Sequence, residues 1–187
     1  MNPIFAAALE IQDFCRERNW RFCVIGGLAV QRWGEPRLTQ DVDLTVISGF
    51  GAEPHFVDNL LQSFQGRLPD TREFALQKRV VLLRSSGGIA VDIALGALPF
   101  EERVVQRASS YAISESVALT TCSAEDLVVL KVFAGREKDW LDVEGIVSRQ
   151  THKLDRTLVW RKLEPLLDLK EDVTAKPRLA KLFANNR

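Results

Sequence analysis

The sequence predicts an α+β fold followed by a C-terminal helical part. Segments of strand length, apolar or alternating, are interspersed with amphipathic helical segments up to about residue 122, and only helical patterns follow. With 187 residues, of which 46% are hydrophobic and 27% charged, the chain is long and apolar enough to bury a substantial core. We therefore expect a core at residues 1–122 and a helical region packed on that core at residues 123–187.

The elements expected before residue 122 follow from the spacing of the apolar residues. Apolar residues three or four apart indicate a helix, and alternation indicates a half-buried strand. A Ser-Ser-Gly-Gly turn between two apolar runs indicates a hairpin. These patterns predict a helix at 3–18, a short buried strand at "FCVIGG", a helix from "LAVQRW", a strand at "DVDLTVI", an amphipathic helix at "PHFVDNLLQSF", hairpin strands at 79–84 and 89–95, and a strand near 117–121.

Helices alone are expected in the last third of the chain. Ser123 is suited to cap a helix, with Asp126 three residues later, and Gly135 interrupts the helical pattern of residues 123–150. Two more helices are expected near 155–168 and 176–184.

Charge, cysteines and hydropathy narrow the class of protein. Lys and Arg together number 25, as do Asp and Glu, so the net charge gives no general nucleic-acid footprint. The three cysteines lie far apart without metal-ligand spacing, which is typical of reduced, buried thiols. The N-terminal segment has no basic region, Glu10 interrupts its apolar run, and no stretch is long enough for a membrane span. We therefore expect a cytoplasmic protein with no membrane partner.

Two aspartates stand at the start of the strand "DVDLTVI". Because strand side chains alternate, Asp41 and Asp43 point to one face, and the apolar Val42 and Leu44 point to the other. Two like charges about 4 Å apart repel by roughly 4 kcal/mol at an effective dielectric near 20. A divalent cation turns this repulsion into chelation. The alternative is a solvated sheet face that is simply acidic.

A third aspartate lies inside the apolar strand "GGIAVDIALG". Asp92 shares its face with the small Ala90 and Ala94, and a lone acid there is costly unless it is paired or bound to a metal. On a strand beside Asp41 and Asp43 it would complete a three-carboxylate site of the kind that holds two Mg²⁺ ions. The alternative role for Asp92 is that of a structural salt-bridge partner.

A glycine pair precedes these carboxylates. Gly26 and Gly27 stand where a strand meets a helix, and thirteen residues separate Gly27 from Asp41. Glycines let a ligand approach the backbone closely, and the first N–H groups of a helix form a natural phosphate seat. The turn is followed by D-x-D on the next strand and by a later strand aspartate. This combination indicates a metal and phosphate site much more specifically than any one of its parts.

Together these motifs resemble the DNA polymerase β-type nucleotidyltransferase superfamily. The pattern reads "VIGG", then "DVDL", then "VDI". The longer "IGGLAVQRWGEPRLTQDVDL", with "EDLVVLKVFAGREKDWLDV" downstream, is similar to the AbiEii-like minimal nucleotidyltransferases, some of which are toxins of toxin–antitoxin pairs. The resemblance covers residues 20–150.

The resemblance implies a fold and a reaction. The fold would be a nucleotidyltransferase-type mixed β-sheet with flanking helices, so that residues 1–122 form the catalytic core. The reaction, of the EC 2.7.7 type, would move an NMP from an NTP such as ATP to an acceptor hydroxyl, with release of pyrophosphate. The acceptor would be an RNA end such as tRNA, a protein or a small molecule, and a cognate antitoxin would be a partner. Asp41, Asp43 and Asp92 would be the catalytic residues and would hold two Mg²⁺ ions, with Mn²⁺ as a substitute, and the Gly26–Gly27 turn would cradle phosphates.

Three further side chains are candidates for nucleotide binding. Arg37 is suited to a phosphate fork and Thr39 to capping the turn, although both could be plain surface loop residues. Lys131 interrupts the apolar helix "LVVLKVFA", so it either extends to solvent or reaches an anion. Basic side chains that could serve an RNA acceptor, or be merely solvated, are Arg67, Arg72, Lys78, Arg79, Arg84, Lys176, Arg178, Lys181 and Arg187.

Two other functions compete with nucleotidyl transfer. "DVDLT" also matches the D-x-D-x-T nucleophile motif of haloacid-dehalogenase-type phosphatases, which needs its first Asp at the end of a buried strand. Here the apolar run follows Asp41, which disfavours that class. The second alternative is a non-catalytic NTP-binding protein of the same fold.

Overall fold

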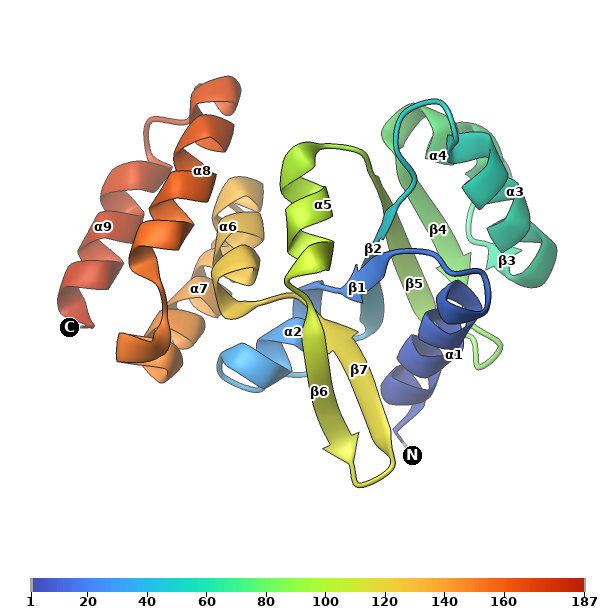
Figure 1. The fold of residues 1–187 in the computed structure, drawn as a ribbon, viewed down its shortest axis with the longest axis horizontal. Helices are drawn as coiled ribbons and strands as arrows, with labels where there is room; N and C mark the ends of the chain where they lie inside the picture. The colour runs from blue at the N-terminus through green and yellow to red at the C-terminus, as the bar shows by residue number, and fades with distance from the viewer. Residues whose placement is uncertain (1, 187) are drawn as a thin grey trace. The chain divides into compact units, whose positions relative to one another are not determined.

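The computed structural model describes residues 2–186. The chain forms two compact units, and each is described by itself. The first unit comprises Met1–Leu28 and Leu38–Cys122, and the second comprises Ala29–Arg37 and Ser123–Arg187. Strands and helices mix in the first unit, while the part of the second that lies after residue 122 is helical, so the predicted α+β class is confirmed (Figure 1).

A seven-stranded mixed sheet forms the centre of the first unit. The strand order in the sheet is β3-β4-β5-β2-β1-β7-β6. β2 runs parallel to β5, and β1 runs parallel to β7, while the other neighbours are antiparallel. The strands are β1 (Phe22–Val24), β2 (Asp41–Ile47), β3 (Gln65–Gly66), β4 (Val80–Arg84), β5 (Ala90–Gly96), β6 (Ser109–Ser114) and β7 (Val117–Thr121).

One face of this sheet carries the hydrophobic core. Alternation along β2 and β5 buries Val42 and Leu44, with Val91 and Ile93, completely. These side chains form one cluster with apolar residues of the helices α1 (Pro3–Glu17), α3 (Glu53–Ser63) and α4 (Thr71–Lys78), which lie beside the strands in Figure 1. Because the core occupies this face, the intervening aspartates must stand on the other, as the alternation predicts.

The second unit is built from α6 (Ala124–Ala134), α7 (Glu137–Gln150), the short 3₁₀ turn η1 (Thr151–Lys153), α8 (Arg156–Lys170) and α9 (Ala175–Asn185). The Ser123 hydroxyl accepts a hydrogen bond of 3.1 Å from the Asp126 amide, which confirms the predicted cap. Gly135 ends α6 with a φ of 72°, a left-handed conformation that costs glycine little. The predicted break in the helical pattern is therefore confirmed.

Residues 29–37 belong to the second unit although the sequence places them among the strands. Arg149 donates a hydrogen bond of 2.5 Å to the carbonyl oxygen of Gly34, and Gln150 donates one of 2.6 Å to that of Trp33. A Cβ at Gly34 would lie 2.9 Å from the Ile146 side chain, so the backbone there is packed against α7. The end of α2 (Gly26–Trp33) and the loop after it are thus held by residues more than a hundred positions away.

Among the described residues, four elements besides the 3₁₀ turn η1 have no counterpart among the predictions. They are α4, α5 (Pro99–Gln106) and the strands β3 and β6. α4 and α5 have eight residues each and β3 has two, too few to show a period. β6 is an edge strand whose residues are exposed or half-buried, so the core imposes little alternation on its sequence.

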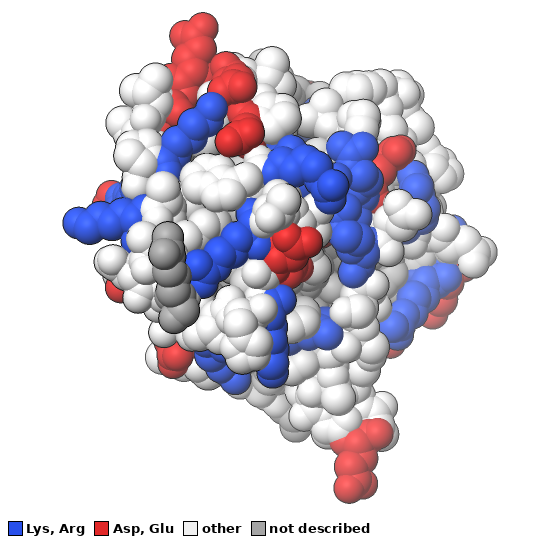
Figure 2. Space-filling view, turned by 60° about the vertical axis from the view of Figure 1, so that its left-hand side comes forward, with Lys and Arg blue, Asp and Glu red and all other residues white. Residues whose placement is uncertain are grey.

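The distribution of surface charge, the burial of the cysteines and the hydropathy of the helices agree with what the composition indicates. Lys and Arg side chains are interspersed with acidic and uncharged ones on the face shown in Figure 2. Cys15, Cys23 and Cys122 are buried, as predicted. In the described part of the chain, no helix combines the length and the hydropathy needed to cross a membrane.

Candidate active site

The sheet register brings the predicted carboxylates together. In the parallel pair of β2 and β5, Asp43 stands directly opposite Asp92, and Asp41 stands opposite Ala90. Neighbouring strands lie about 4.8 Å apart, and paired residues point to the same face. The three aspartates therefore share one face of two adjacent strands, as the family resemblance implies.

The environment of Asp92 differs from that of an ordinary surface carboxylate. Its pKa is raised, mainly because burial disfavours the charged form. The Arg67 guanidinium opposes this rise, and the Asp41 carboxylate adds to it. The influence of Asp41 shows that negative charge accumulates at this point of the sheet.

The glycine turn lies directly against Asp43. Gly26 has a φ of +61°, and a Cβ built on it would lie 1.9 Å from an Asp43 carboxylate oxygen. The position of the backbone before Gly26 is fixed by a hydrogen bond of 2.9 Å that the Ile25 amide donates to the Asp43 carbonyl oxygen. Only glycine therefore fits at position 26 without moving the carboxylate.

Thr39 joins the second glycine to the first aspartate. A Cβ on Gly27 would lie 2.3 Å from the Thr39 hydroxyl oxygen. That hydroxyl donates a hydrogen bond of 3.0 Å to the Asp41 carboxylate, so Thr39 orients Asp41. α2 begins at this turn, and the first N–H groups of a helix have no partners within it. Carboxylates, a glycine cradle and a helix N-terminus thus occur together, which is the combination that a metal-bound phosphate needs.

Arg67 binds Asp92, and no local pattern in the sequence indicates this partner. Its guanidinium forms an ion pair with the Asp92 carboxylate, although 25 residues separate the two in the chain. The salt-bridge role considered for Asp92 is therefore present. Among the described residues, no three His, Cys, Asp or Glu side chains are arranged to hold a metal ion. Carboxylate oxygens are the right donors for Mg²⁺, so the chemistry of the donor set fits, and metal binding stays a prediction.

The predicted nucleotide ligands Lys131 and Arg37 lie in a buried ionic cluster of the second unit. The Lys131 ammonium is 3.1 Å from an Asp139 oxygen and 2.8 Å from an Asp142 oxygen. Arg37 binds Asp142 through two hydrogen bonds of 2.6 and 2.9 Å, and Arg136 binds Asp139 at 2.6 Å. Lys131 is therefore buried, and its charge is neutralised by two carboxylates of α7. Contact of Lys131 and Arg37 with a nucleotide stays a prediction.

The aspartates of this cluster are held in the charged form. Burial pushes the pKa of Asp139 upward, but hydrogen bonds from Arg136 and Lys131 outweigh it, so the pKa lies below its usual value. For Asp142, burial is likewise outweighed by Arg37 and Lys131, and the pKa is lowered. The cluster is therefore a set of mutually compensated charges.

Several of the basic side chains considered for an RNA acceptor have partners within the chain. Arg72 binds Asp58 at 2.7 Å, and Arg178 binds Glu137 at 2.9 Å. Arg67 and Arg79 are paired with Asp92 and Glu53, Arg84 bonds the Gly88 carbonyl oxygen, and Lys176 is paired with Asp168. Lys78 and Lys181 are exposed, and Arg187 lies outside the described residues. Most of this charge is thus already used within the protein.

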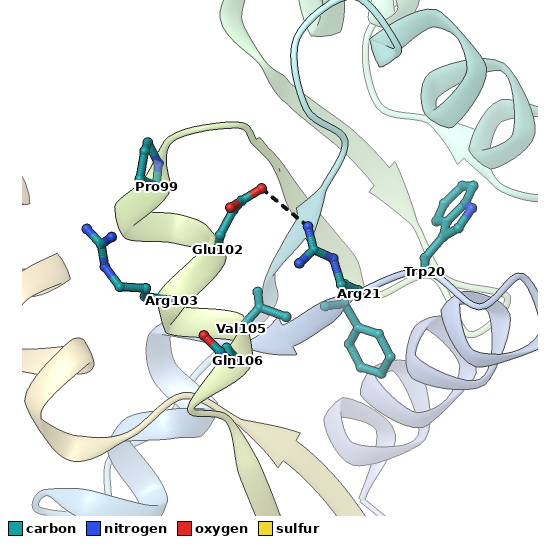
Figure 3. A pocket seen from close by; sticks show the side chains of 8 residues that line it. Trp20, Arg21, Pro99, Glu102, Arg103, Val105 and Gln106 are labelled. Atoms are coloured by element: carbon teal, nitrogen blue, oxygen red, sulfur yellow. Dashed lines mark hydrogen bonds and ion pairs between the residues drawn. The ribbon is translucent and has the colours of Figure 1, made fainter.

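A pocket of about 450 Å³ lies elsewhere in the first unit, and Trp20, Phe22 and residues of α5 line it. Figure 3 shows Arg21 and Glu102 joined at this pocket by an ion pair of 3.3 Å. Phe22 pairs with Val46, at the end of β2 away from Asp41. The pocket is therefore separate from the carboxylates and holds none of the predicted site residues.

The fold is similar to solved structures of nucleotidyltransferases. An antigenic nucleotidyltransferase-like protein from Paracoccidioides brasiliensis matches with a TM-score of 0.52 and 16% identity, over 98% of this chain and 93% of that chain. The lincosamide antibiotic adenylyltransferase LnuA, solved with lincomycin bound, matches with a TM-score of 0.51 and 13% identity, over 76% of this chain and 96% of that chain. At such identities these matches show the fold, which is that of a nucleotidyltransferase.

The family follows from the sequence itself. The family model described as nucleotidyl transferase AbiEii toxin, Type IV TA system, matches residues 19–185. The chain therefore belongs to the AbiEii nucleotidyl transferase family, and the predicted resemblance is confirmed. A search of curated proteins found no match.

Proposed function

We propose that this protein is a metal-dependent nucleotidyltransferase that moves an NMP from an NTP to an acceptor hydroxyl. The observation that carries the proposal is the register of β2 and β5, which sets Asp43 opposite Asp92 on the face that also holds Asp41. The glycine turn against Asp43 supplies backbone N–H groups for phosphate beside these carboxylates. Membership of a nucleotidyl transferase family supports this assignment over the phosphatase, as does the position of Asp41 at the start of β2.

Each residue of the site has a defined task in this proposal. Asp41, Asp43 and Asp92 would hold the metal ions, Asp41 and Asp43 would bind the triphosphate through them, and the Thr39 hydroxyl fixes the Asp41 carboxylate. The Gly26–Gly27 turn binds phosphate oxygens through its N–H groups. Bound Mg²⁺ neutralises phosphate charge and lowers the pKa of the acceptor hydroxyl.

The reaction balances without any further reagent. The acceptor oxygen attacks the α-phosphorus in line, the new P–O bond forms, and the bond to the bridging oxygen breaks, so that pyrophosphate leaves. Asp92, which stands opposite Asp43 on the same face of the sheet, is assigned to accept the hydroxyl proton.

Lys131 and Arg37 are assigned to nucleotide binding, with the α7 carboxylates as their partners before the nucleotide arrives. Both are cations, and Arg37 already presents two N–H groups in parallel to a carboxylate, a geometry that a phosphate can take up. Their assignment needs a test that separates binding from stability, because both side chains take part in the ionic cluster.

The family description supports a biological setting. We assign the protein as a toxin-type transferase with a cognate antitoxin as partner and with ATP or another NTP as donor. An RNA end or a protein is the acceptor class tested first, and a small molecule is the alternative.

The test is nucleotide-dependent stabilisation together with label transfer. Mg²⁺–NTP at a hundredfold excess over its dissociation constant should add about 2.7 kcal/mol of stability, or roughly 5–10 °C in Tm. Asp41→Asn combined with Asp43→Asn should abolish this shift and leave the metal-free protein as stable or more stable, because like-charge repulsion is removed. Labelled NTPs are then incubated with pools of tRNA, protein and small alcohols.

A matched control removes two exposed carboxylates elsewhere, Asp70→Asn with Glu115→Gln, and should keep both the shift and the transfer. A stabilising shift without transfer to any pool would favour the non-catalytic binding protein. A double variant at Asp41 and Asp43 that keeps the full shift would refute the proposed site.

A further inference from the structure

Arg67 lies in line with the catalytic carboxylates across the sheet. It directly follows β3, and its amide donates a hydrogen bond of 2.9 Å to the Leu82 carbonyl oxygen of β4. Leu82 stands opposite Asp92, which stands opposite Asp43. One row of the sheet therefore runs from Arg67 through Leu82 to the two aspartates, and the long arginine side chain spans Leu82 to reach Asp92.

The contact that Arg67 makes is incomplete. Its Nη2 binds one oxygen of Asp92, while its Nε is buried and has no hydrogen-bond partner in the described residues. Arg37 and Arg72 use two nitrogens each to bind both oxygens of Asp142 and Asp58. A buried N–H group without a partner is costly. The guanidinium is thus held more weakly in this position than the fork geometry of an arginine allows.

The partner of Arg67 is Asp92, which is also the proposed metal ligand. Side-chain exposures of 24% for Arg67 and 33% for Asp92 leave the pair open to solvent and to ions. A guanidinium and a divalent cation on the same carboxylate repel each other, because both are positive. A metal ion on Asp92 therefore weakens the ion pair with Arg67, and Arg67 weakens the binding of the metal ion.

We propose that Arg67 is the resident counter-ion of Asp92, that it competes with the metal ion for this carboxylate, and that it leaves Asp92 when the metal binds. This inference rests on the proposed function, because it takes Asp92 as a metal ligand. Arg67 is then a positioning residue that sets the metal concentration at which the site assembles, and before the metal binds it reduces the repulsion between Asp92 and the other two carboxylates.

The experiment measures Mn²⁺ binding without nucleotide, at constant pH, by the electron paramagnetic resonance signal of free Mn²⁺. Arg67→Met keeps an apolar stem and removes the charge, and should bind Mn²⁺ roughly tenfold more tightly, which corresponds to about 1.4 kcal/mol. Arg67→Lys keeps the positive charge and should stay within about twofold of the unmodified protein. Arg72→Met is the matched control, since it also removes one arginine from a carboxylate pair, and should change nothing.

The outcomes separate the two proposals. Equal or weaker Mn²⁺ binding by Arg67→Met, beside normal binding by the unmodified protein, overturns the role of Arg67 alone. If neither protein binds Mn²⁺, the metal site itself is wrong, and the proposed function falls with it.

A second measurement follows Arg67 in the unmodified protein and needs no variant that lacks the charge. In the unmodified protein, the Nε–Hε NMR signal of Arg67 is assigned by its loss in Arg67→Lys and followed during a Mg²⁺ titration. Release from Asp92 should move this signal in step with metal binding, while the signal of Arg72 stays in place. A signal of Arg67 that is unchanged at saturating Mg²⁺ overturns the proposal.

Discussion

Removal of the Lys131 charge should destabilise the second unit. The ammonium bonds two carboxylates at 3.1 and 2.8 Å, and the side chains of Lys131, Asp139 and Asp142 are 8%, 0% and 3% exposed. Loss of one partner from a buried ion pair costs about 3–5 kcal/mol, because it leaves uncompensated charge. Each carboxylate keeps an arginine, Arg136 or Arg37, so for Lys131→Met we expect the lower end, about 3 kcal/mol.

Urea denaturation followed by tryptophan fluorescence measures this loss. Trp33, Trp140 and Trp160 belong to the second unit, so the signal reports mainly on it. At a slope of about 2 kcal/mol per molar urea, the midpoint should fall by about 1.5 M. Lys138→Met is the matched control, because Lys138 is exposed on α7, and its midpoint should stay unchanged. Equal midpoints for the two variants would refute the reasoning from burial.

The same variant tests the assignment of Lys131 to the nucleotide. At a temperature where Lys131→Met is fully folded, loss of a phosphate contact should lower single-turnover transfer by ten- to a thousandfold, or about 1.4–4 kcal/mol. Unchanged transfer by the folded variant would restrict Lys131 to the ionic cluster.

Two further predictions concern the glycine turn and the acid limit of stability. Gly26→Ala should cost about 1–2 kcal/mol for its positive φ and also abolish the Mg²⁺–NTP shift, because its Cβ would displace Asp43. Gly88→Ala, at a φ of +79° with nothing within 4 Å, should show the backbone cost alone, and a normal nucleotide shift in both variants would contradict the role of the turn. Because the pKa values of Asp139 and Asp142 are lowered in the folded protein, their stabilising contribution is present above the unfolded value near about 3.9 and is lost as pH falls through the folded values. The urea midpoint of the second unit should therefore decline below about pH 4, and a midpoint that stays constant down to pH 3 would show that these carboxylates contribute nothing.

Much of the fold could be predicted because its information is local. The alternation in β2 separates Asp41 and Asp43 from buried Val42 and Leu44, and this pattern depends only on the period of a strand. The cap at the start of α6 and its glycine end are likewise read within a few residues. The elements that escaped prediction are short, and they lack the apolar run beside the Gly26–Gly27 turn by which the equally short β1 and α2 were recognised.

The candidate site also has a part that local sequence patterns predict and a part that they do not. The glycines and the three aspartates were recognisable because each lies in a strand or turn with its own local pattern. That Asp43 faces Asp92 could be expected only from the resemblance to a family, since it depends on which strands pair and in what register.

The sequence by itself determined the mixed sheet, the helices after it, the face on which the aspartates stand and the glycine turn before them. Tertiary structure alone decided which charge meets which. Arg67 finds Asp92 across 25 residues and Arg37 finds Asp142 across 105, and the backbone around Gly34 is held by Arg149. A charged side chain specifies no partner by its own identity, because any opposite charge within reach satisfies it. Only the register of the sheet and the packing of the helices set which partner is within reach.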